Sequence, residues 1–435
     1  MTHCKTLKPS VTTWDYLLIG RYHPSRPSHS LAFRLTLLPL RGLFHILIPA
    51  LLIRYHLWLC FQIQAIRLVS VKPRSFVFDS ILNLTKANIS AEFGVLTLPI
   101  LRITDEHRAS LVQSLVQSQA TVTDACLPSC HSLTRYVNAF FDGFYPHMPI
   151  VHIPTFDVED CPPELILAMA ALGAQYRHEH RKGVLLFYAA KSILQKGARE
   201  REKRIVSESS LNSSSGISEG PYSPHSAGVL DEATTSSTQP HEELMREARC
   251  TLYLIVFATW QRETELVREA FALQSSLARC IREIGLEESV EVLQNTVVDW
   301  RTWVQQESDR RVKIFSFAFL NLQCIAFNVP PILLSDEIQL RLPSSCMEWI
   351  APDQEKWALV RQPGHQEQVL FQDGLKRLMR GSRDTDPNPE QRPSPLANYI
   401  LLHAIIQQII LTRQALFFAI DDDSSLQQAQ NENFM

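Results

Sequence analysis

The sequence predicts an all-α protein, a large irregular bundle or array of helices with disordered inserts and an atypical apolar N-terminal extension. Apolar residues make up 45% of the 435-residue chain, which is enough for a sizeable core. From about Leu133 onward they recur at three- and four-residue spacing, the period of an amphipathic helix. No run of useful length alternates with the two-residue period of a strand, so we expect helices only.

The composition divides the chain into four regions. Residues 1–78 form a basic, apolar N-terminal extension of unknown role, and residues 79–130 form a linker or leading segment. The helical periodicity fills residues 131–420, which we interpret as one main domain. Residues 421–435 are expected to be a flexible tail.

Two segments interrupt the main domain. Eleven of the 35 residues in 206–240 are serine, and such a stretch buries too little apolar surface to offset its ordering entropy. It predicts a disordered insert, in which Ser223, followed by Pro224, is a candidate for proline-directed phosphorylation. Residues 381–395 contain four prolines and predict a second loop.

Charge is distributed unevenly along the chain. Residues 1–78 contain ten Lys or Arg against a single acid, Asp15. They therefore carry +9, which leaves −12 for the remaining residues because the whole chain carries −3. The main domain has no overall basic face for nucleic acid, and any contact with DNA must be local.

The N-terminal extension contains the most apolar stretch, residues 31–71. A membrane span over residues 43–63 would place Arg54 near the middle of the bilayer, at a cost of about 2.5–3.5 kcal/mol. We therefore expect no membrane span and interpret this stretch as foreign to the domain that follows. The acid-poor composition also suits an organellar transit segment, and a membrane-associated regulatory or interaction protein anchored through residues 43–63 is the alternative.

The first predicted helix is aromatic. Its apolar stripe consists of Leu133, Tyr136, Val137, Phe140, Phe141 and Phe144. Three prolines then force an extended segment that ends at Phe156, because proline disfavours helix at the preceding residue: Pro146, Pro149 and Pro154. Glu164–Ala174 is apolar on nearly all sides, so we expect a buried helix, followed by another over Val184–Arg204.

Helices resume after the serine-rich insert. We expect them over Leu244–Trp260 and over Glu265–Ile284, the latter capped by Gly285. Thr296–Phe327 is expected to be the longest helix, and Leu396–Ile420 to be the last one, packed back on the bundle because it is strongly apolar.

The cysteines and histidines provide one weak zinc pattern. Cys126 and Cys130 precede His147 and His152, but sixteen residues separate the two pairs where a two-Cys, two-His finger has about twelve. The intervening residues read as a helix followed by prolines, so we interpret the four as isolated core or loop residues. No Cys-x2-Cys pair occurs in the sequence, and the nine scattered cysteines favour a reducing compartment.

The sequence contains no recognisable catalytic constellation. It has no Gly-x-Ser-x-Gly elbow, no phosphate-binding glycine loop and no His-Glu-x-x-His. We therefore predict that the chain is not an enzyme, with no catalytic or cofactor-binding residues.

The segment from Trp300 to Arg311 places an ion pair beside an aromatic face. Trp300, Trp303 and Glu307 share one side of a helix, and Glu307 is spaced to pair with Arg310 or Arg311. Such a pair is typical of the edge of a core helix. The alternative is that it lines a cavity for a small effector.

Three signatures in this order resemble the regulatory domain of fungal-specific transcription factors. The first runs from Tyr136 to Phe156 through Phe140, Phe144 and Pro149, and the second is Glu164–Ala174 with its Ala-Leu-Gly-Ala end at Gly173. The third consists of Trp300, Trp303, Glu307, Arg311, Pro331, Leu342, Pro343 and Trp349. The resemblance covers roughly residues 130–420 and is greatest to the subgroup with paired two-Cys, two-His fingers.

The resemblance implies a helical regulatory domain of a nuclear transcription factor that controls RNA polymerase II transcription. It implies DNA and the transcription machinery or another regulator as partners, and it allows a homodimer. Zinc is implied only for the family's separate DNA-binding module. Residues 1–130 offer no ligand set for such a module, so we expect no direct sequence-specific DNA binding by this chain.

Overall fold

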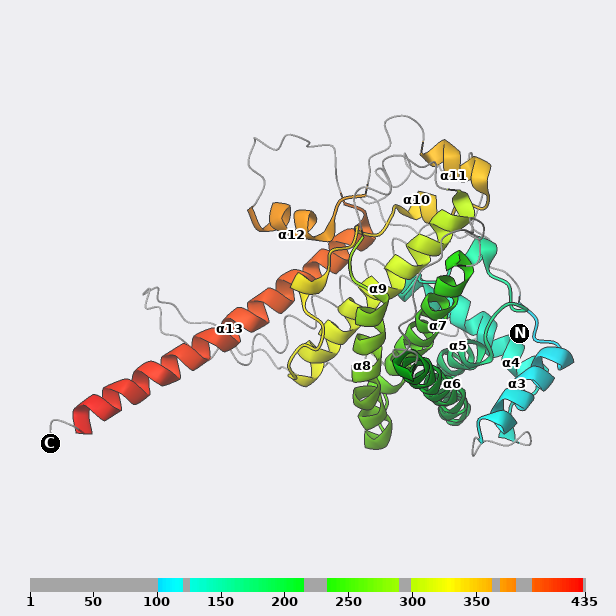
Figure 1. Ribbon diagram of the computed structural model, residues 1–435, viewed down its shortest axis with the longest axis horizontal. Helices are drawn as coiled ribbons and strands as arrows, with labels where there is room; N and C mark the ends of the chain where they lie inside the picture. Colours follow the sequence, from blue (N-terminus) through cyan, green and yellow to red (C-terminus); the bar gives the residue numbers. More distant parts are fainter. Residues whose placement is uncertain are drawn as a thin grey trace, which may run out of the picture. The chain divides into compact units, whose positions relative to one another are not determined.

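The computed structural model describes residues 101–119, 126–214, 233–288, 299–361, 368–380 and 393–432. Within these ranges the chain forms eleven α-helices, α3 to α13, with short π and 3-10 turns between some of them (Figure 1). The same ranges contain no strand and only two isolated bridges, Glu287 with Gln339 and Arg341 with Leu370. The all-α prediction is confirmed for the part of the chain that the structure describes.

The leading segment contains a helix that the sequence analysis took as linker. Helix α3 spans Asp105–Gln117, and Thr104 caps it by accepting from the backbone amide of His107. The side chains of Leu111 and Leu115, one turn apart, are both buried. This helix escapes prediction because a capped helix with only two buried positions gives a weak periodic signal.

The aromatic signature forms a helix that changes type partway along. Helix α4 (Cys130–Ala139) continues into the π-helical turn η3 (Phe140–Phe144) and the 3-10 turn η4 (Tyr145–His147). A further 3-10 turn, η5 (Ile153–Thr155), follows the prolines. The wider π turn places consecutive rings, Phe140 and Phe141, into the core together.

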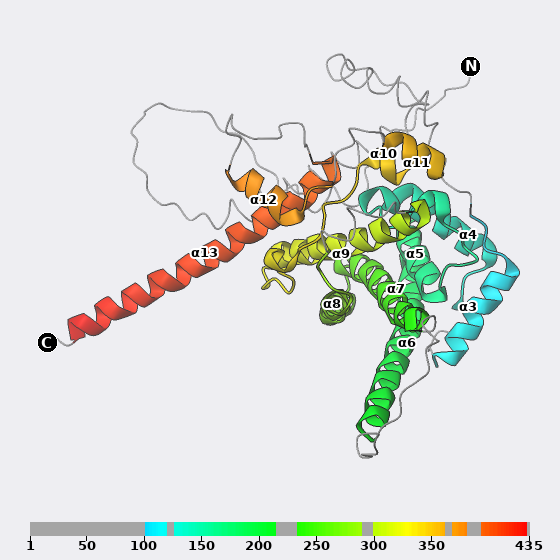
Figure 2. The ribbon, with the colours of Figure 1, turned by 45° about the horizontal axis from the view of Figure 1, so that its top comes forward.

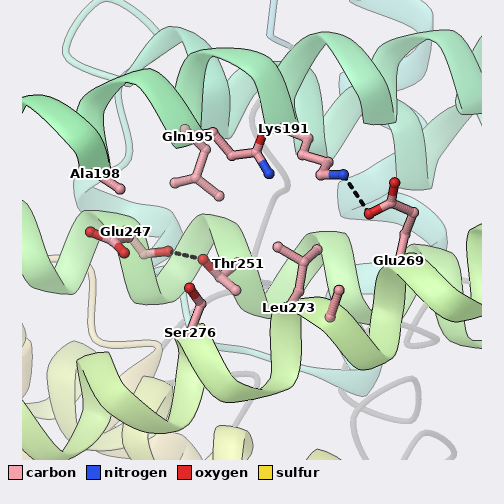
Figure 3. Close-up of a pocket in the computed structure, with 10 residues that line it drawn as sticks. Lys191, Gln195, Ala198, Glu247, Thr251, Glu269, Leu273 and Ser276 are labelled. Carbon is pink, nitrogen blue, oxygen red and sulfur yellow. Dashed lines mark hydrogen bonds and ion pairs between the residues drawn. The ribbon is translucent and has the colours of Figure 1, made fainter.

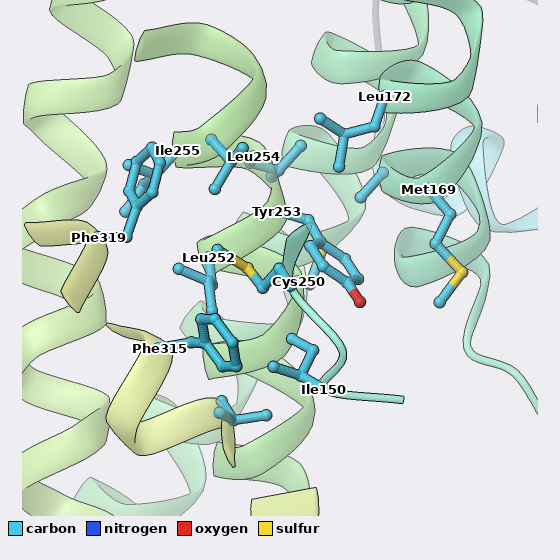
Figure 4. Close-up of a cluster of buried hydrophobic side chains, with 14 of the residues drawn as sticks. Ile150, Met169, Leu172, Cys250, Leu252, Tyr253, Leu254, Ile255, Phe315 and Phe319 are labelled. Atoms are coloured by element: carbon cyan, nitrogen blue, oxygen red, sulfur yellow. The ribbon is translucent and has the colours of Figure 1, made fainter. Parts of the chain in front are cut away.

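Helix α5 (Pro163–Tyr176) lies at the centre of the bundle, as its sequence predicts. It packs against α4, α6 (His180–Ser214) and α7 (Ala233–Thr259). Every residue from Glu164 to Ala174 is buried. Figure 4 shows Met169 and Leu172 of α5 facing Tyr253 of α7 across this core.

The two helices that flank the serine-rich segment are longer than predicted. Helix α6 runs to Ser214 and α7 begins at Ala233, so both ends of the predicted disordered insert 206–240 are helical. No Gly or Pro lies between Val206 and Ser214 to stop the first helix. Figure 2 shows α6 and α7 running side by side. The two helices are antiparallel, since Arg201 pairs with Glu247 and the later Arg204 pairs with the earlier Glu243.

Helices α8 (Thr264–Ile284) and α9 (Trp300–Phe327) agree with the sequence to within a few residues. Gly285 ends α8 with φ at 93°, a left-handed value that favours glycine. Helix α9 ends at Asn328 in the left-handed region, just before the two prolines. The prediction that this helix is the longest is wrong, since α13 spans 38 residues against 28 for α9.

The C-terminal third adds two short helices, α10 (Cys346–Trp349) and α11 (Gln354–Val360), and then α12 (Phe371–Arg380). Helix α13 spans Pro395–Glu432 and packs on α9 and α12. The predicted tail 421–435 is therefore helical up to Glu432, because no glycine or proline follows Pro395 to end the helix.

One described stretch, Pro395–Gln414 in α13, is long and apolar enough to cross a membrane. Half of that stretch is buried inside the protein, as expected for a helix that packs on α9. The predicted alternative span 43–63 lies outside the described residues.

A close approach between α4 and α5 depends on Gly173. A Cβ atom at this position would lie 1.8 Å from the carbonyl oxygen of Tyr136. We predict that Gly173→Ala lowers the free energy of unfolding by about 1–3 kcal/mol, because a backbone oxygen cannot move aside. Chemical denaturation provides the measurement. Gly197→Ala on α6 is the control and should stabilise the protein by about 0.5–1 kcal/mol, since nothing lies within 4 Å of its added methyl group.

His403 on α13 makes stability depend on pH. Its side chain is fully buried, neither ring nitrogen has a hydrogen-bond partner among the described residues, and burial lowers its pKa to about 3. The unfolded chain therefore binds a proton that the folded protein excludes, and stability is lost as the pH falls below about 6.5.

We predict that His403→Leu flattens this pH dependence by up to about 1.4 kcal/mol per pH unit between pH 6 and 4. Denaturant titrations of both proteins at several pH values provide the comparison. Identical slopes would show that the imidazole is solvated in the native state.

Candidate functional site

A buried carboxylate lies at the centre of the third signature. Glu307 has no exposed surface, and its oxygens accept hydrogen bonds from four different groups. These are the guanidinium groups of Arg310 and Arg311, the backbone amide of Ser344 and the side-chain amide of Gln368. The distances are 2.8 Å to Arg311 Nε, 2.9 Å to Ser344 N and 3.0 Å to Gln368 Nε2.

Arg311 joins this carboxylate to the first signature. Its Nη1 donates to the carbonyl oxygen of Pro149 at 3.2 Å, and its Nη2 donates to the carbonyl oxygen of Ser344 at 3.3 Å. The guanidinium carbon also lies 4.0 Å from the ring centre of Trp349, a cation–π contact. A single buried arginine thus connects segments that are 162 positions apart in the chain.

Arg310 binds a second carboxylate in addition to Glu307. Its Nε and Nη2 donate to the two carboxylate oxygens of Glu288 at 2.8 and 3.0 Å, a bidentate pair. We call the set of Glu307, Arg310, Arg311, Ser344 and Gln368 the Glu307 cluster. It fixes three loop segments against α9.

The electrostatics of the Glu307 cluster favour the ionised carboxylate. Burial alone would raise the pKa of Glu307, but the Arg311 and Arg310 guanidiniums together with the Ser344 amide outweigh it and lower that pKa. The pKa of Arg310 is raised by Glu307 and Glu288 against the effect of its burial. Both charges therefore persist in the core.

A separate aromatic cluster closes one side of this site. It consists of Trp300, Trp303, Val304, Trp349, Ala351 and Trp357. The indole nitrogen of Trp349 donates to the hydroxyl of Tyr145 at 3.1 Å, and the ring of His152 meets the Trp349 ring edge-on at 4.9 Å. The third signature thus packs on the segment that follows the aromatic helix.

The Glu307 pair is part of the core, since both Glu307 and Arg311 are buried. Neither Glu307 nor Arg311 lines the two cavities described. The better-defined one, of about 150 Å³, lies between α6, α7 and α8, and Figure 3 shows it among Lys191, Gln195 and Leu273. The other interpretation is an ordinary ion pair at the edge of a core helix. Glu307 and Arg311 are buried more deeply than that interpretation implies.

The first two signatures meet in the main core. Phe140 and Phe144 pack against the ring of Tyr253 at 5.2 and 5.7 Å, and Phe156 lies 5.1 Å from the Phe141 ring. The hydroxyl of Tyr136 donates to Glu179, and burial together with this carboxylate raises the pKa of Tyr136 to about 12. These aromatic residues therefore position the bundle and leave no open pocket among themselves.

The last part of the third signature positions loops. Pro331 is half-buried after α9. The amide of Leu342 donates to the carbonyl oxygen of Val369 at 2.8 Å, and the carbonyl oxygen of Pro343 accepts from the Ser394 hydroxyl at 3.3 Å. These bonds hold Ser344 where its amide reaches Glu307.

The four weak zinc candidates do not form a metal site in the structure. Cys126 is exposed, while Cys130 donates its thiol to Asp105 at 3.1 Å. Burial lowers the pKa of His147 and of His152 to about 4, and His152 contacts Thr155 at 2.9 Å. No group of three or more His, Cys, Asp or Glu side chains suited to a metal occurs among the residues described. The phosphorylation candidate Ser223 lies outside them.

The sequence analysis did not identify Ser344 and Gln368 as members of the Glu307 cluster, nor the carbonyl oxygen of Pro149 as its partner. Two of these contributions come from the backbone, which carries no signal in the residue type. The sequence contains one indication of the Pro149 contact: Pro149 lies in a signature segment that forms no helix of its own. Nothing in the spacing indicates Gln368.

The comparisons with known proteins agree with this geometry. Residues 137–432 match the family model described as the fungal specific transcription factor domain. The chain is also 23% identical over 286 residues to the zinc finger protein zas1 of Schizosaccharomyces pombe, an alignment that covers 66% of this chain and 28% of that protein's length. No solved structure matches the chain significantly. The chain belongs to the fungal specific transcription factor domain family, and a role in transcription regulation follows from that membership.

We predict that Glu307→Gln lowers the free energy of unfolding by about 3–5 kcal/mol, because it leaves two buried guanidiniums without their shared anion. Urea unfolding monitored by tryptophan fluorescence provides the measurement. Glu265→Gln is the matched control, because Glu265 pairs with Arg268 at the surface, and its effect should stay below about 0.5 kcal/mol. Equal effects of the two substitutions would contradict the role of the Glu307 cluster.

Proposed function

We propose that residues 131–432 form the regulatory body of a nuclear transcription factor that controls RNA polymerase II transcription without a catalytic step. The family match over residues 137–432 is the observation that carries this proposal. The match includes all three signatures, which the Glu307 cluster and the α4–α5 core join into one body. A rigid helical body with a closed interior suits control through its surface.

DNA recognition by the full protein is assigned to a zinc module outside the matched residues. The relative zas1 is a zinc finger protein, and the aligned part covers 28% of its length. This body carries a net negative charge and offers no broad basic face to a duplex. Its contribution is therefore regulation through contacts with other proteins, in the nucleus.

A tethering assay tests the regulatory role. We expect the full chain, fused to an unrelated DNA-binding domain, to change transcription of a reporter that carries the matching operator by about tenfold, within the range typical of regulatory couplings. The Glu307→Gln fusion should lose this effect in proportion to its lost stability, while Glu265→Gln should keep it. A stable fusion in the nucleus that leaves the reporter unchanged would contradict the proposal.

A mobility-shift assay on the purified chain tests the assignment of DNA recognition. We expect no tight sequence-specific complex. Specific binding to a defined operator in the range of about 10⁻⁸ M or tighter would overturn the assignment, because that affinity is typical of a dedicated DNA-reading module.

A further inference from the structure

Exposed aromatic side chains gather at one end of the bundle. Four of the large apolar side chains that the described residues expose are aromatic: Tyr176, Tyr188, Trp260 and Phe327. Tyr176 ends α5 and Trp260 follows α7 directly, and the Trp260 ring stacks on Phe327 at 6.4 Å. Tyrosine, tryptophan and arginine are the residues enriched where proteins bind one another.

The two turns that carry Tyr176 and Trp260 are held together, whereas Tyr188 lies inside α6 and Phe327 ends α9. The side-chain amide of Gln175 donates to that of Gln261 at 3.3 Å, and the His180 ring lies 3.0 Å from the carboxylate of Glu263. These contacts join the α5–α6 turn to the α7–α8 turn. Tyr176 and Trp260 therefore lie on one surface, which the Trp260–Phe327 stacking extends to the end of α9.

The same turns carry a local excess of positive charge. Arg177, Arg181, Lys182 and Arg262 are exposed, and none of them forms an ion pair with a described carboxylate. Of the neighbouring acids, Glu179 pairs with Arg135 and Glu265 with Arg268. Glu263 contacts the His180 ring and lies in the field of Arg262, so the four cations outnumber the carboxylates left to them. A cationic surface on a body of net negative charge is complementary to acidic side chains of a partner.

A cavity lies farther along α6, and we call it the α6–α8 groove. The cavity of about 150 Å³ lies between α6 and α8, with α7 as its floor, and Leu194, Ala198 and Leu273 give it an apolar lining (Figure 3). Lys191 and Glu269 pair across it, as the dashed line in Figure 3 shows. Arg181, Tyr188 and Gln195 repeat every seven residues along α6, so they share one face that connects the cations to the groove.

The length of this surface sets the size of its ligand. From Arg181 to Ala198, α6 rises by about 25 Å at about 1.5 Å per residue. A helix of about 16 residues spans the same distance. A helix that lays its apolar side chains in a groove is a common mode of peptide recognition.

We propose that the α6–α8 groove and its basic, aromatic end dock an amphipathic helical segment of a partner protein that carries acidic residues at one end. This proposal rests on the proposed function and names the kind of partner through which the body acts. The acidic end lies against Arg177, Arg181, Lys182 and Arg262, and an apolar side chain of the helix enters the α6–α8 groove.

Nucleic acid is the rival ligand for the same cations. A duplex extends past the basic end and meets a body that carries net negative charge, whereas a short peptide contacts only the local surface, because charges are screened beyond about 8 Å at physiological salt. Duplex phosphates also make no use of an apolar groove. The observations therefore favour the peptide.

The experiment selects peptides from a displayed library of random segments of about 16 residues on the full chain. Enriched peptides are then measured by fluorescence anisotropy against three variants. These are Arg181→Glu with Lys182→Glu, which reverses the charge, Ala198→Trp with Ala272→Trp, which fills the groove, and Lys376→Glu with Arg380→Glu on α12 as the matched charge control. A labelled duplex of arbitrary sequence is measured in parallel.

We expect the enriched peptides to combine a helical apolar stripe with Asp or Glu at one end. The charge reversal and the groove-filling variant should each weaken their binding about tenfold or more, and the α12 control less than about twofold. Circular dichroism melts confirm that each variant is folded. Failure to enrich any peptide, equal binding by all folded variants, or tight binding of the duplex alone would overturn the proposal.

The tethered reporter separates this proposal from the proposed function. A groove-filled fusion that is folded and inactive supports both. A folded groove-filled fusion that keeps full reporter activity overturns the docking site and leaves the regulatory function standing. A wild-type fusion without reporter activity overturns the proposed regulatory function. The anisotropy measurements then decide separately whether the docking site binds peptide.

Discussion

The structure depends on the compensation of one carboxylate that has no contact with water. Removing such a charge from solvent costs several kcal/mol, so it persists only where donors surround it. Glu307 obtains them from its own helix, from the chain that follows α9 and from Gln368. All of these segments must be in place at once. Because Arg311 also holds the carbonyl oxygen of Pro149, the same requirement extends to the first signature.

Buried side chains pack the space between the three signatures, and this packing bears on function. The aromatic cluster around Trp349 and the packed rings of α4, α5 and α7 fill the space between the signatures, and Figure 4 shows this filling around Tyr253. This packing favours regulation through the surface of the body. The basic, aromatic end and the α6–α8 groove are the surface that we propose for it. The buried clusters keep α6, α7 and α8 in register for that surface.

Much of the fold follows from the sequence and parts of it do not. Helical periodicity predicts the aromatic helix, the buried α5 and the paired charges of α9, because burial and spacing are recorded in residue types. Helix α3 and the ends of α6, α7 and α13 are not predicted, because a composition rich in Ser, Thr and other polar residues is typical of loops as well as of exposed helix ends. The two arginine partners of Glu307 follow from their spacing, but the Ser344 amide and the Gln368 side chain could not be predicted. Tertiary packing places both of these groups, and the exposure of Trp260 and Tyr176 is likewise a tertiary property.

Hydrogen exchange of wild type and Arg311→Met tests most directly whether one buried arginine joins the first signature to the third. The account predicts faster exchange in both residues 145–153 and residues 342–350 of the variant, with α6 and the adjoining half of α7 unchanged, because Arg311 contacts both of the first two segments. Faster exchange in only one of those segments, or uniform acceleration over all helices, would contradict it.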